Sequence, residues 1–286
     1  MAFLIDIKKK IQSVQGTRKI TQAMELVAAS RMKGFQRKAL ASRAYAGALV
    51  AGLDEARVSW GELSFSEARE KGKTLFVVVT SDKGLCGSLN QQLIRALLRE
   101  PRWNALGEGD KLLFTIGRKS FEAVHARGIP VEKRFEGLKE DMRPLDALAI
   151  VHEIVSLWDS GEVREVLFVE PEYVNAFTTH VLVKQYLPFG PEMIESHLAK
   201  EPPDRRHLQT ASASEPELFF EPTREILIER LAEQLLEALF SQAFFELKAS
   251  EYSSRMVAMK HATEAAGDMI KALTREYNKA RQGAIT

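Results

Sequence analysis

Apolar residues recur every three or four positions along the C-terminal part of the chain. No proline occurs after Pro222, and from Ile228 the series continues without a break. Its members are Ile228, Leu231, Leu235, Ala238, Gln242, Phe245, Ala249, Tyr252, Met256, Met259, Thr263, Ala266, Ile270, Leu273, Tyr277 and Ala280. A seam held over about seven heptads predicts a coiled-coil helix. At ~1.5 Å per residue the helix would be roughly 80 Å long, so it must lie against another long helix or inside a partner.

A second seam occupies the N-terminal segment, where no proline occurs before Pro101. It consists of Leu4, Ile7, Ile11, Val14, Thr17, Thr21, Met24, Ala28, Met32, Phe35, Ala39, Ser42, Ala46, Leu49 and Leu53. We expect helices over 1–60 and 223–286 that pair as a long antiparallel coiled coil. Small or flexible residues fill the far half of the C-terminal seam and bury little apolar area, at ~25 cal/mol per Å². The sequence pattern is compatible with a coiled coil that associates with itself and with a helix that other chains support.

Between the two arms the pattern changes to that of an inserted α/β domain, expected over 72–190. Continuous apolar runs predict strands buried on both faces, and alternation predicts a strand at a sheet edge. The expected strands are 73–80, 111–117, 131–135, 165–170 and 177–187, the last at the edge. The expected helices are 88–99, 119–127 and 144–159. This order implies a mostly parallel, Rossmann-like sheet, followed by a long mobile connection over 191–222 that is rich in Pro, Ser and charge.

Composition narrows the class of protein. The chain has 45% hydrophobic and 28% charged residues and a net charge of +1, which is typical of one or two soluble globular domains. A single cysteine excludes an internal disulfide and fits a reducing compartment. The first ten residues lack the features of a signal or transit peptide, and no run of ~18 apolar residues predicts a membrane span.

Charge is unevenly distributed along the N-terminal arm. Its first 45 residues hold ten basic side chains but, as acidic ones, only Asp6 and Glu25. The basic residues are Lys8, Lys9, Lys10, Arg18, Lys19, Arg31, Lys33, Arg37, Lys38 and Arg43. Such a run is either a solvated face or a surface for an acidic protein or a nucleic-acid backbone. Nucleic acid is the less favoured partner, because the arm has no interleaved aromatic residues and no nucleic-acid-binding motif.

The loop 81–90, SDKGLCGSLN, follows a predicted buried strand, where α/β folds usually bind ligands. It matches neither GxxxxGK[ST] nor GxGxxG. It partly matches a nucleophile elbow, which would make Cys86 the nucleophile of a cysteine hydrolase and one of three histidines its base. Those histidines are His125, His152 and His180. A lone cysteine after a buried strand is more often a packed apolar residue, and the histidines and cysteine show no metal-ligand spacing.

Four segments together resemble a known family. They are 11–32 (IQSVQGTRKITQAMELVAASRM), 81–90 (SDKGLCGSLN), 249–260 (ASEYSSRMVAMK) and 277–286 (YNKARQGAIT). In this order they are similar to the characteristic segments of gamma subunits of F-type ATP synthases, and the resemblance covers essentially the whole chain.

The resemblance implies a non-catalytic central rotor shaft that needs no cofactor or metal of its own. The terminal helices would turn inside a ring of three alpha and three beta subunits, while the α/β domain would sit at the foot, near the epsilon subunit and the membrane c-ring. The delta subunit is a further candidate neighbour. Torque on the shaft would couple proton flow to ATP synthesis on the beta subunits. The implied location is peripheral, on the cytoplasmic face of a bacterial inner membrane.

The resemblance also assigns site residues. Contacts to the alpha/beta collar are implied for Lys8, Lys9, Arg18, Lys19, Met24, Arg31, Lys33, Arg255, Arg281 and Gln282. A structural role in the loop is implied for Asp82, Gly84, Cys86 and Gly87. The chain departs from the family at Tyr252, Ala265 and Ser88, where His, Asn and Gly are usual. Family members also commonly continue past the position of Thr286, so we expect either a truncated chain or a shortened tip.

Replacing the only cysteine distinguishes a rotor from a hydrolase. A rotor with Cys86→Ala should couple ATP turnover to proton transport nearly as well as the parent chain, because the side chain only packs. A cysteine hydrolase with this substitution should lose its activity, because the nucleophile is gone. Proton pumping by the reconstituted complex and ester hydrolysis by the isolated chain measure the two outcomes.

Overall fold

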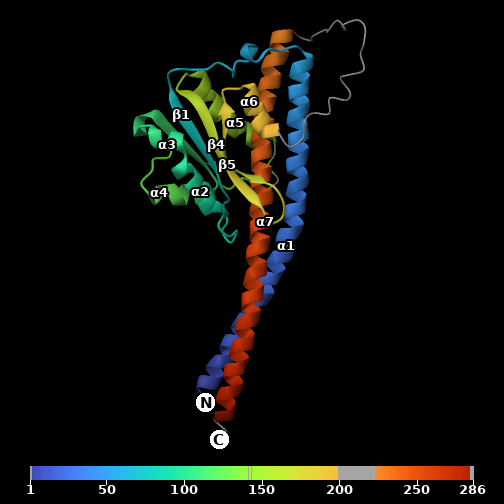
Figure 1. The fold of residues 1–286 in the computed structure, drawn as a ribbon, viewed down its shortest axis with the longest axis vertical. Coiled ribbons are helices and arrows are strands. Elements are labelled where there is room, and N and C mark those ends of the chain that lie inside the picture. Colours follow the sequence, from blue (N-terminus) through green and yellow to red (C-terminus); the bar gives the residue numbers. More distant parts are fainter. Residues whose placement is uncertain (1, 141, 143, 199–222, 284–286) are drawn as a thin grey trace.

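The computed structural model describes residues 2–140, 142, 144–198 and 223–283, and it consists of a long helical coil with an α/β domain at its side. Helix α1 (Ala2–Glu55) and helix α7 (Arg224–Gly283) form the coil. Figure 1 shows both chain ends at the same end of the coil and the domain beside its opposite half. The predicted pairing of two terminal helices around an inserted domain is therefore confirmed.

The two helices pack through the seams that the sequence predicts. Buried seam residues on α1 include Ala28, Met32, Phe35, Ala39 and Ala46, and those on α7 include Leu235, Ala249 and Tyr252. The ring of Phe35 stacks on that of Tyr252, with centroids 5.6 Å apart and planes 4° apart. Small residues let the helix backbones approach, and the few aromatic residues fill the space between them.

A five-stranded sheet forms the centre of the domain, in the order β3-β2-β1-β4-β5. Its strands are β1 (Lys73–Val79), β2 (Lys111–Ile116), β3 (Lys133–Phe135), β4 (Val163–Tyr173) and β5 (Thr179–Leu187). The first four are parallel and β5 is antiparallel to β4, as predicted for a mostly parallel sheet with an edge strand. In the middle of the sheet, Phe76 of β1 lies opposite Leu113 of β2 and Leu167 of β4.

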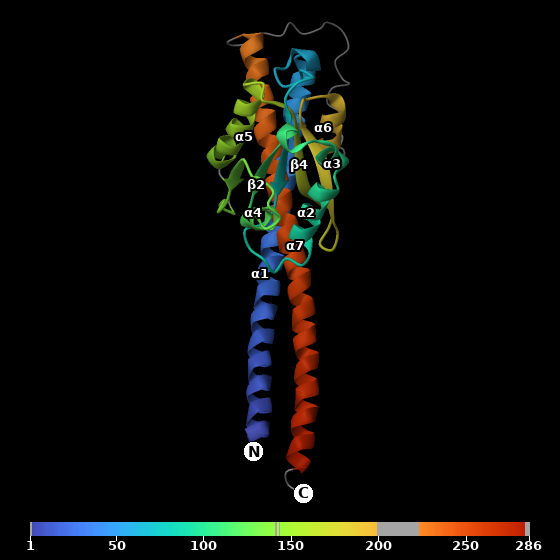
Figure 2. The ribbon, with the colours of Figure 1, turned by 90° about the vertical axis from the view of Figure 1, so that its left-hand side faces the viewer.

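Helices cover both faces of this sheet, which is why its central strands are almost wholly apolar. The domain's helices are α2 (Leu89–Arg99), α3 (Pro101–Ala105), α4 (Arg118–His125), α5 (Pro144–Asp159) and α6 (Pro191–Leu198), with short 3₁₀ turns at Trp60–Glu62 and Glu108–Asp110. Helices α2 and α4 lie on the face away from the coil, whereas α5 and α7 cover the other face (Figures 1 and 2). The coil is therefore also a layer of the domain.

Because α7 belongs to both parts, the coil and the domain share one hydrophobic core. That core runs from Leu49 of α1 through Leu239 and Phe240 of α7 to Phe168 of β4. The ring of Phe168 packs on Tyr186, at 4.4 Å between centroids, and on Phe240, at 6.2 Å. Consequently α7 is buried on nearly every face between Leu235 and Arg255, but only on a narrow stripe beyond Met259.

The structure corrects the sequence prediction in three places. The N-terminal helix, expected to reach residue 60, ends at Glu55. Residues 191–198, expected in a mobile connection, form helix α6, whose Met193, Ile194 and Leu198 are buried in the shared core. The apolar residues on one face of this short helix are buried, and this burial favours a helix although the segment is rich in Pro and Gly. Residues 199–222 of that connection lie outside the described residues. The short helix α3, with Pro101 at its first position, was not expected.

The continuity of α7 through the end of the domain can be tested with proline. Met259 is 6% exposed within the helix, so Met259→Pro should remove a backbone hydrogen bond and clash with the preceding turn, at a cost of ~3 kcal/mol or more. Circular dichroism should show lost helix while tryptophan fluorescence of the domain core is retained. Met259→Leu is the control, and full helicity in the proline variant would show that the helix does not depend on this position.

Candidate functional site

Half of the coil stands free of the domain. Figures 1 and 2 show no other element of the described chain beside this part, which comprises residues 3–27 of α1 and 257–283 of α7 and is called the bare shaft below. Its buried residues form one narrow stripe between the helices: Ile7, Thr21, Met259, Ala266 and Leu273. So little buried area gives a weakly stabilised pair, as the small seam residues predicted.

A polar contact lies within this stripe. The hydroxyl oxygens of Thr21 and Thr263 are 2.7 Å apart, and each also reaches a carbonyl of its own helix, that of Arg18 at 3.0 Å and that of Met259 at 2.8 Å. A hydrogen bond between helices in an otherwise apolar seam disfavours other registers, because a shifted register would leave the hydroxyls without each other. The pair therefore fixes how the two helices are aligned along the bare shaft.

The outer surface of the bare shaft carries large apolar side chains that the chain itself leaves uncovered. Their exposed fractions lie between 50% and 67%, for Phe3, Ile5, Ile20, Leu26, Val27 and Met269. Heptad analysis missed them because it selects only the residues between the helices. Apolar residues at positions outside the seam were the available signal. Exposed apolar side chains gathered on one element indicate a surface that another protein covers.

Most of the predicted partner-contact residues lie on the same bare shaft. These are Lys8, Lys9, Arg18, Lys19, Met24, Arg281 and Gln282. All except Met24, which is half-buried in the seam, are exposed. The exposed surface of α1 thus carries both basic and apolar side chains, which suits a partner with apolar and acidic groups.

Arg31 and Lys33 lie at the level where the domain begins. Both are exposed, but the Arg31 guanidinium already contacts Glu140 of the loop before α5 at 2.7 Å. The second oxygen of Glu140 accepts a hydrogen bond from the Tyr252 hydroxyl, so one carboxylate joins that loop to both helices of the coil. Tyr252, which stands where the family usually has histidine, therefore has Glu140 as its hydrogen-bond partner.

Arg255 differs from the other predicted contact residues because it is buried. Its guanidinium donates to the Gly84 carbonyl at 3.1 Å and to Glu251 at 2.7 Å, and it lies over the Tyr252 ring at 5.1 Å. The side chain is 8% exposed. The structure therefore revises this assignment: Arg255 fastens α7 to the 81–90 loop inside the chain and offers little surface to a partner.

The remaining loop residues have contacts that shape the turn. The Asp82 carboxylate accepts the Arg118 backbone N–H at 2.9 Å and so caps helix α4. Leu85 and Gly87 both have positive φ, 62° and 59°, on either side of Cys86. Ser88, where the family usually has glycine, has φ −94°, so that position needs no glycine, and its hydroxyl accepts a bond from Gln92.

Helix α7 contacts the loops around the place where doubly wound sheets usually bind ligands. That place lies beyond the carboxyl ends of the strands where the strand order reverses, here between β1 and β4. Arg255 reaches the loop after β1, and the Ser253 hydroxyl donates to the Ala176 carbonyl in the loop after β4, at 2.6 Å. These bonds make the ligand-like loop part of the joint between the domain and the coil, although a pocket of ≈ 500 Å³ between Asp82, Arg118 and Glu251 remains open beside it.

The chemistry of Cys86 does not fit a nucleophile. Burial raises the pKa of its thiol, which keeps it protonated, and the side chain is 2% exposed. Its hydrogen-bonding neighbours are the Ser81 hydroxyl at 3.8 Å, the Asn90 amide at 3.2 Å and the Lys83 carbonyl at 4.0 Å. Among the described residues no histidine is bonded to it. The elbow geometry also differs, because the positive φ falls on Leu85 rather than on Cys86.

The described part of the chain has neither a metal-binding cluster nor a membrane span. No group of three or more His, Cys, Asp or Glu side chains is placed to hold a metal ion. None of the helices described there has an apolar stretch long enough to cross a bilayer.

Comparison with protein families gives a match along nearly the whole chain. The family model described as "ATP synthase" matches residues 4–286. A similar curated protein is the ATP synthase gamma chain of Glaesserella parasuis serovar 5, 33% identical over 289 residues, which cover 100% of this chain and 96% of that one. The ATP synthase gamma chain of Pelotomaculum thermopropionicum is 32% identical over 288 residues, with coverage of 100% and 95%.

Solved structures share the fold. A chain in the central stalk and c-ring of the Tetrahymena thermophila mitochondrial ATP synthase aligns with a TM-score of 0.60 and 24% identity, covering 85% of this chain and 99% of that one. A chain in the rotor of the Euglena gracilis mitochondrial ATP synthase aligns with a TM-score of 0.61 and 16% identity, covering 100% and 99%. At these identities the likeness shows the fold alone.

Arg255 and Arg31 offer a matched test of the joint. Arg255→Met leaves the Gly84 carbonyl and part of the buried Glu251 carboxylate without a partner, so the free energy of unfolding should fall by ~1–3 kcal/mol. Arg31→Met removes an exposed ion pair and should change it by ~0–1 kcal/mol. Urea unfolding of the full chain measures both, and equal effects would contradict the role given to Arg255.

Proposed function

Because the chain belongs to the ATP synthase gamma-chain family, we propose that it is the central rotor shaft of the F1 sector, which transmits torque between a membrane c-ring and catalytic beta subunits and so couples proton flow to ATP synthesis. The bare shaft is the observation that supports this most. A helix pair that buries little area between its helices and exposes basic and apolar side chains suits a shaft that is enclosed by other subunits. As in the family, the catalytic sites would lie on the beta subunits and not on this chain.

The proposed contact surface is the bare shaft with the adjoining turn of α1. It includes Lys8, Lys9, Arg18, Lys19, Met24, Arg31, Lys33, Arg281 and Gln282, together with the exposed apolar residues named above. Ion pairs between exposed side chains are individually weak and are screened by salt. Contacts of this kind with acidic lobes of the beta subunits can break and re-form as the shaft turns, without holding it in one orientation.

The domain end of the coil is proposed to be the foot of the rotor. There the α/β domain would meet the epsilon subunit and the c-ring, and delta is a further candidate neighbour within the complex. The shared hydrophobic core supports this arrangement, because a shaft that carries torque must not slip within its own foot. The complex would lie peripherally on the cytoplasmic face of a bacterial inner membrane.

We divide the chain for this function into an N-terminal arm (1–60), an inserted domain (72–190), a connection (191–222) and a C-terminal arm (223–286). Helix α6 packs with the inserted domain and is better counted as its last element. The alternative of a cysteine hydrolase has no support from the surroundings of Cys86 described above.

Reconstitution with cognate alpha and beta subunits tests the proposal. The chain should co-elute with them in size-exclusion chromatography and sustain multi-site ATP hydrolysis, whereas alpha and beta alone should not. Replacing Lys8, Lys9, Arg18 and Lys19 with Gln should weaken binding at least roughly fourfold, given ~0.2–1 kcal/mol for each exposed pair.

The matched control replaces four exposed basic residues of the domain, Lys71, Arg95, Arg99 and Arg127, with Gln. This variant should bind alpha and beta like the parent chain. Failure of the parent chain to co-elute, or equal loss in both variants, would contradict the proposed surface.

A further inference from the structure

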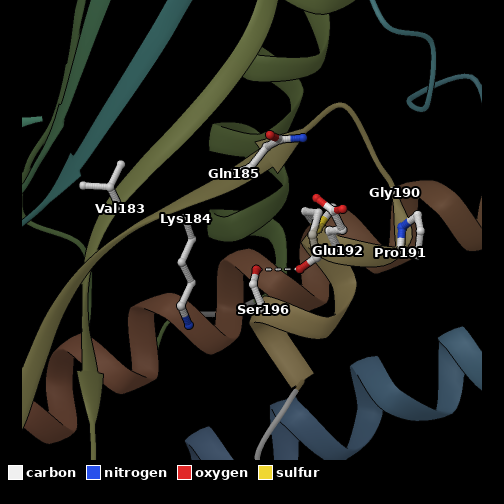
Figure 3. A pocket seen from close by; sticks show the side chains of 8 residues that line it. Val183, Lys184, Gln185, Gly190, Pro191, Glu192 and Ser196 are labelled. Carbon is white, nitrogen blue, oxygen red and sulfur yellow. Dashed lines mark hydrogen bonds between the residues drawn. The ribbon is translucent and has the colours of Figure 1, made fainter. Parts of the chain in front are cut away.

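A cluster of charged side chains is buried where the sheet meets the coil. Lys184 of β5 is 6% exposed, and its ammonium lies 3.4 Å from the Glu170 carboxylate and 3.8 Å from that of Glu172, both on β4. Figure 3 shows the Lys184 side chain extending from β5 toward α7, while Gln185 points to the opposite side. The Lys184 ammonium thus lies where strands β4 and β5 of the domain meet helix α7 of the coil.

The cluster continues into both helices of the coil. Glu246 of α7 accepts hydrogen bonds from Arg43 of α1 at 2.5 Å, from Gln242 at 3.2 Å and from the Tyr173 backbone N–H at 3.3 Å. Arg43 and Glu246 are almost fully buried, with side chains 10% and 3% exposed. Electrostatic interaction links Glu246 to Lys184 and Glu170 as well, so the charges form one group.

The charges of this group do not balance if every member is ionised. Among the residues that the structure describes, three carboxylates, Glu170, Glu172 and Glu246, face two cations, Lys184 and Arg43. A net negative charge in the interior is costly, because the protein replaces water with a medium of low dielectric constant. Glu172 has a route to solvent and to the exposed His180, 3.9 Å away, and Glu246 has three donors. Glu170 is therefore the carboxylate least well supported as an anion.

The surroundings of Glu170 point the same way. It is 3% exposed, and within the described part of the chain its buried Oε2 atom has no hydrogen-bond partner. An ionised carboxylate oxygen in this position would be desolvated and uncompensated, whereas a protonated one would carry no charge. Tyr186 of β5, whose hydroxyl donates to the Leu236 carbonyl of α7, offers it no donor.

We propose that this cluster is a proton-binding site of the rotor, in which Glu170 takes up one proton and thereby stabilises the attachment of the sheet to α1 and α7. The proton adds to the carboxylate oxygen and no other bond changes. A pocket of ≈ 420 Å³ between β5 and α6 reaches Lys184, the cation that pairs with Glu170, and Glu192 also lines it (Figure 3). If the chain is the rotor shaft proposed above, the joint that carries its torque is firmer when this site is protonated.

The acid–base properties of the cluster agree with this geometry. Burial raises the pKa of Glu170 from 4.5 to about 7, against the opposing effect of Lys184. A carboxyl group whose pKa is higher in the folded than in the unfolded chain binds more protons when folded. Its stabilising contribution is therefore complete below pH 4.5, falls as the pH rises to about 7, and is then lost.

His197 of α6 acts in the opposite direction over an overlapping range. Burial and the nearby Lys184 lower its pKa from 6.5 to about 4, and its Nε2 atom lies 2.8 Å from the Gln185 carbonyl oxygen. The folded chain binds fewer protons at His197, so this residue increases stability as the pH rises from about 4 to 6.5. The pH profile of the parent chain alone therefore cannot isolate Glu170, and a difference between variants is needed.

The experiment compares Glu170→Gln with the parent chain by urea unfolding of the full chain from pH 5 to pH 8. Dividing the unfolding constant of the parent by that of the variant, pH by pH, cancels the contribution of His197. This ratio should rise by about tenfold per pH unit up to pH 7 and then level off. The control is Glu162→Gln, which alters an exposed pair with Lys73 and should give a flat ratio. A flat ratio for Glu170→Gln would overturn the proposal.

Infrared spectroscopy of the parent chain decides the question if Glu170→Gln does not fold. A carboxylic-acid C=O band that is present at pH 6 and lost by pH 8 would support a buried protonated glutamate, and its absence would overturn the proposal. Neither result bears on assembly with alpha and beta subunits, so a failure of this inference is distinguishable from a failure of the proposed function.

Discussion

The structure depends on one helix that packs in two ways at once. Between Leu235 and Arg255, α7 pairs with α1 and also forms a covering layer of the sheet, so nearly every face of it is buried. Removing α7 would expose the apolar face of β4 and would also remove the helix against which α1 packs. The coil and the domain are for this reason one folding unit with a shared core, although the chain builds them from separate segments.

Polar contacts then fix the orientation that apolar packing leaves free. Hydrophobic burial is non-directional, so it holds the sheet against α7 without specifying the level along the helix. Ser253 and Arg255 donate to backbone carbonyls on either side of the helix, and Arg43 pairs with Glu246 deeper in the core. Buried ion pairs add little net stability compared with apolar residues, but a shifted arrangement would leave their charges unpaired. They therefore specify the joint more than they stabilise it.

The bare shaft has the opposite design. Its buried stripe is narrow, the Thr21–Thr263 pair sets its register, and large apolar residues remain on its outer surface. A coil that relied on itself would place Leu and Ile between its helices rather than outside them. Of the seven large apolar residues of α1 that are exposed in the described chain, five lie on the bare shaft and two, Leu40 and Tyr45, lie beside the domain.

Local patterns determined the elements of this protein. The heptad seams, the buried β-branched runs at 73–79 and 111–116, and the charge of the N-terminal arm were all readable from the sequence, because each follows from the periodicity of one helix or strand. The resemblance of four segments pointed to the family.

By contrast, α6 was missed because its apolar face is recognisable only against β5 and α7. Arg255 was assigned to the partner-contact surface because the resemblance implied it; only the position of Gly84, far away in the chain, makes it an internal contact. The cluster around Glu170 could not be predicted either, because its charges come from four elements, α1, β4, β5 and α7, that only the tertiary structure brings together. Burial, which sets their protonation, is also a property of the tertiary structure alone.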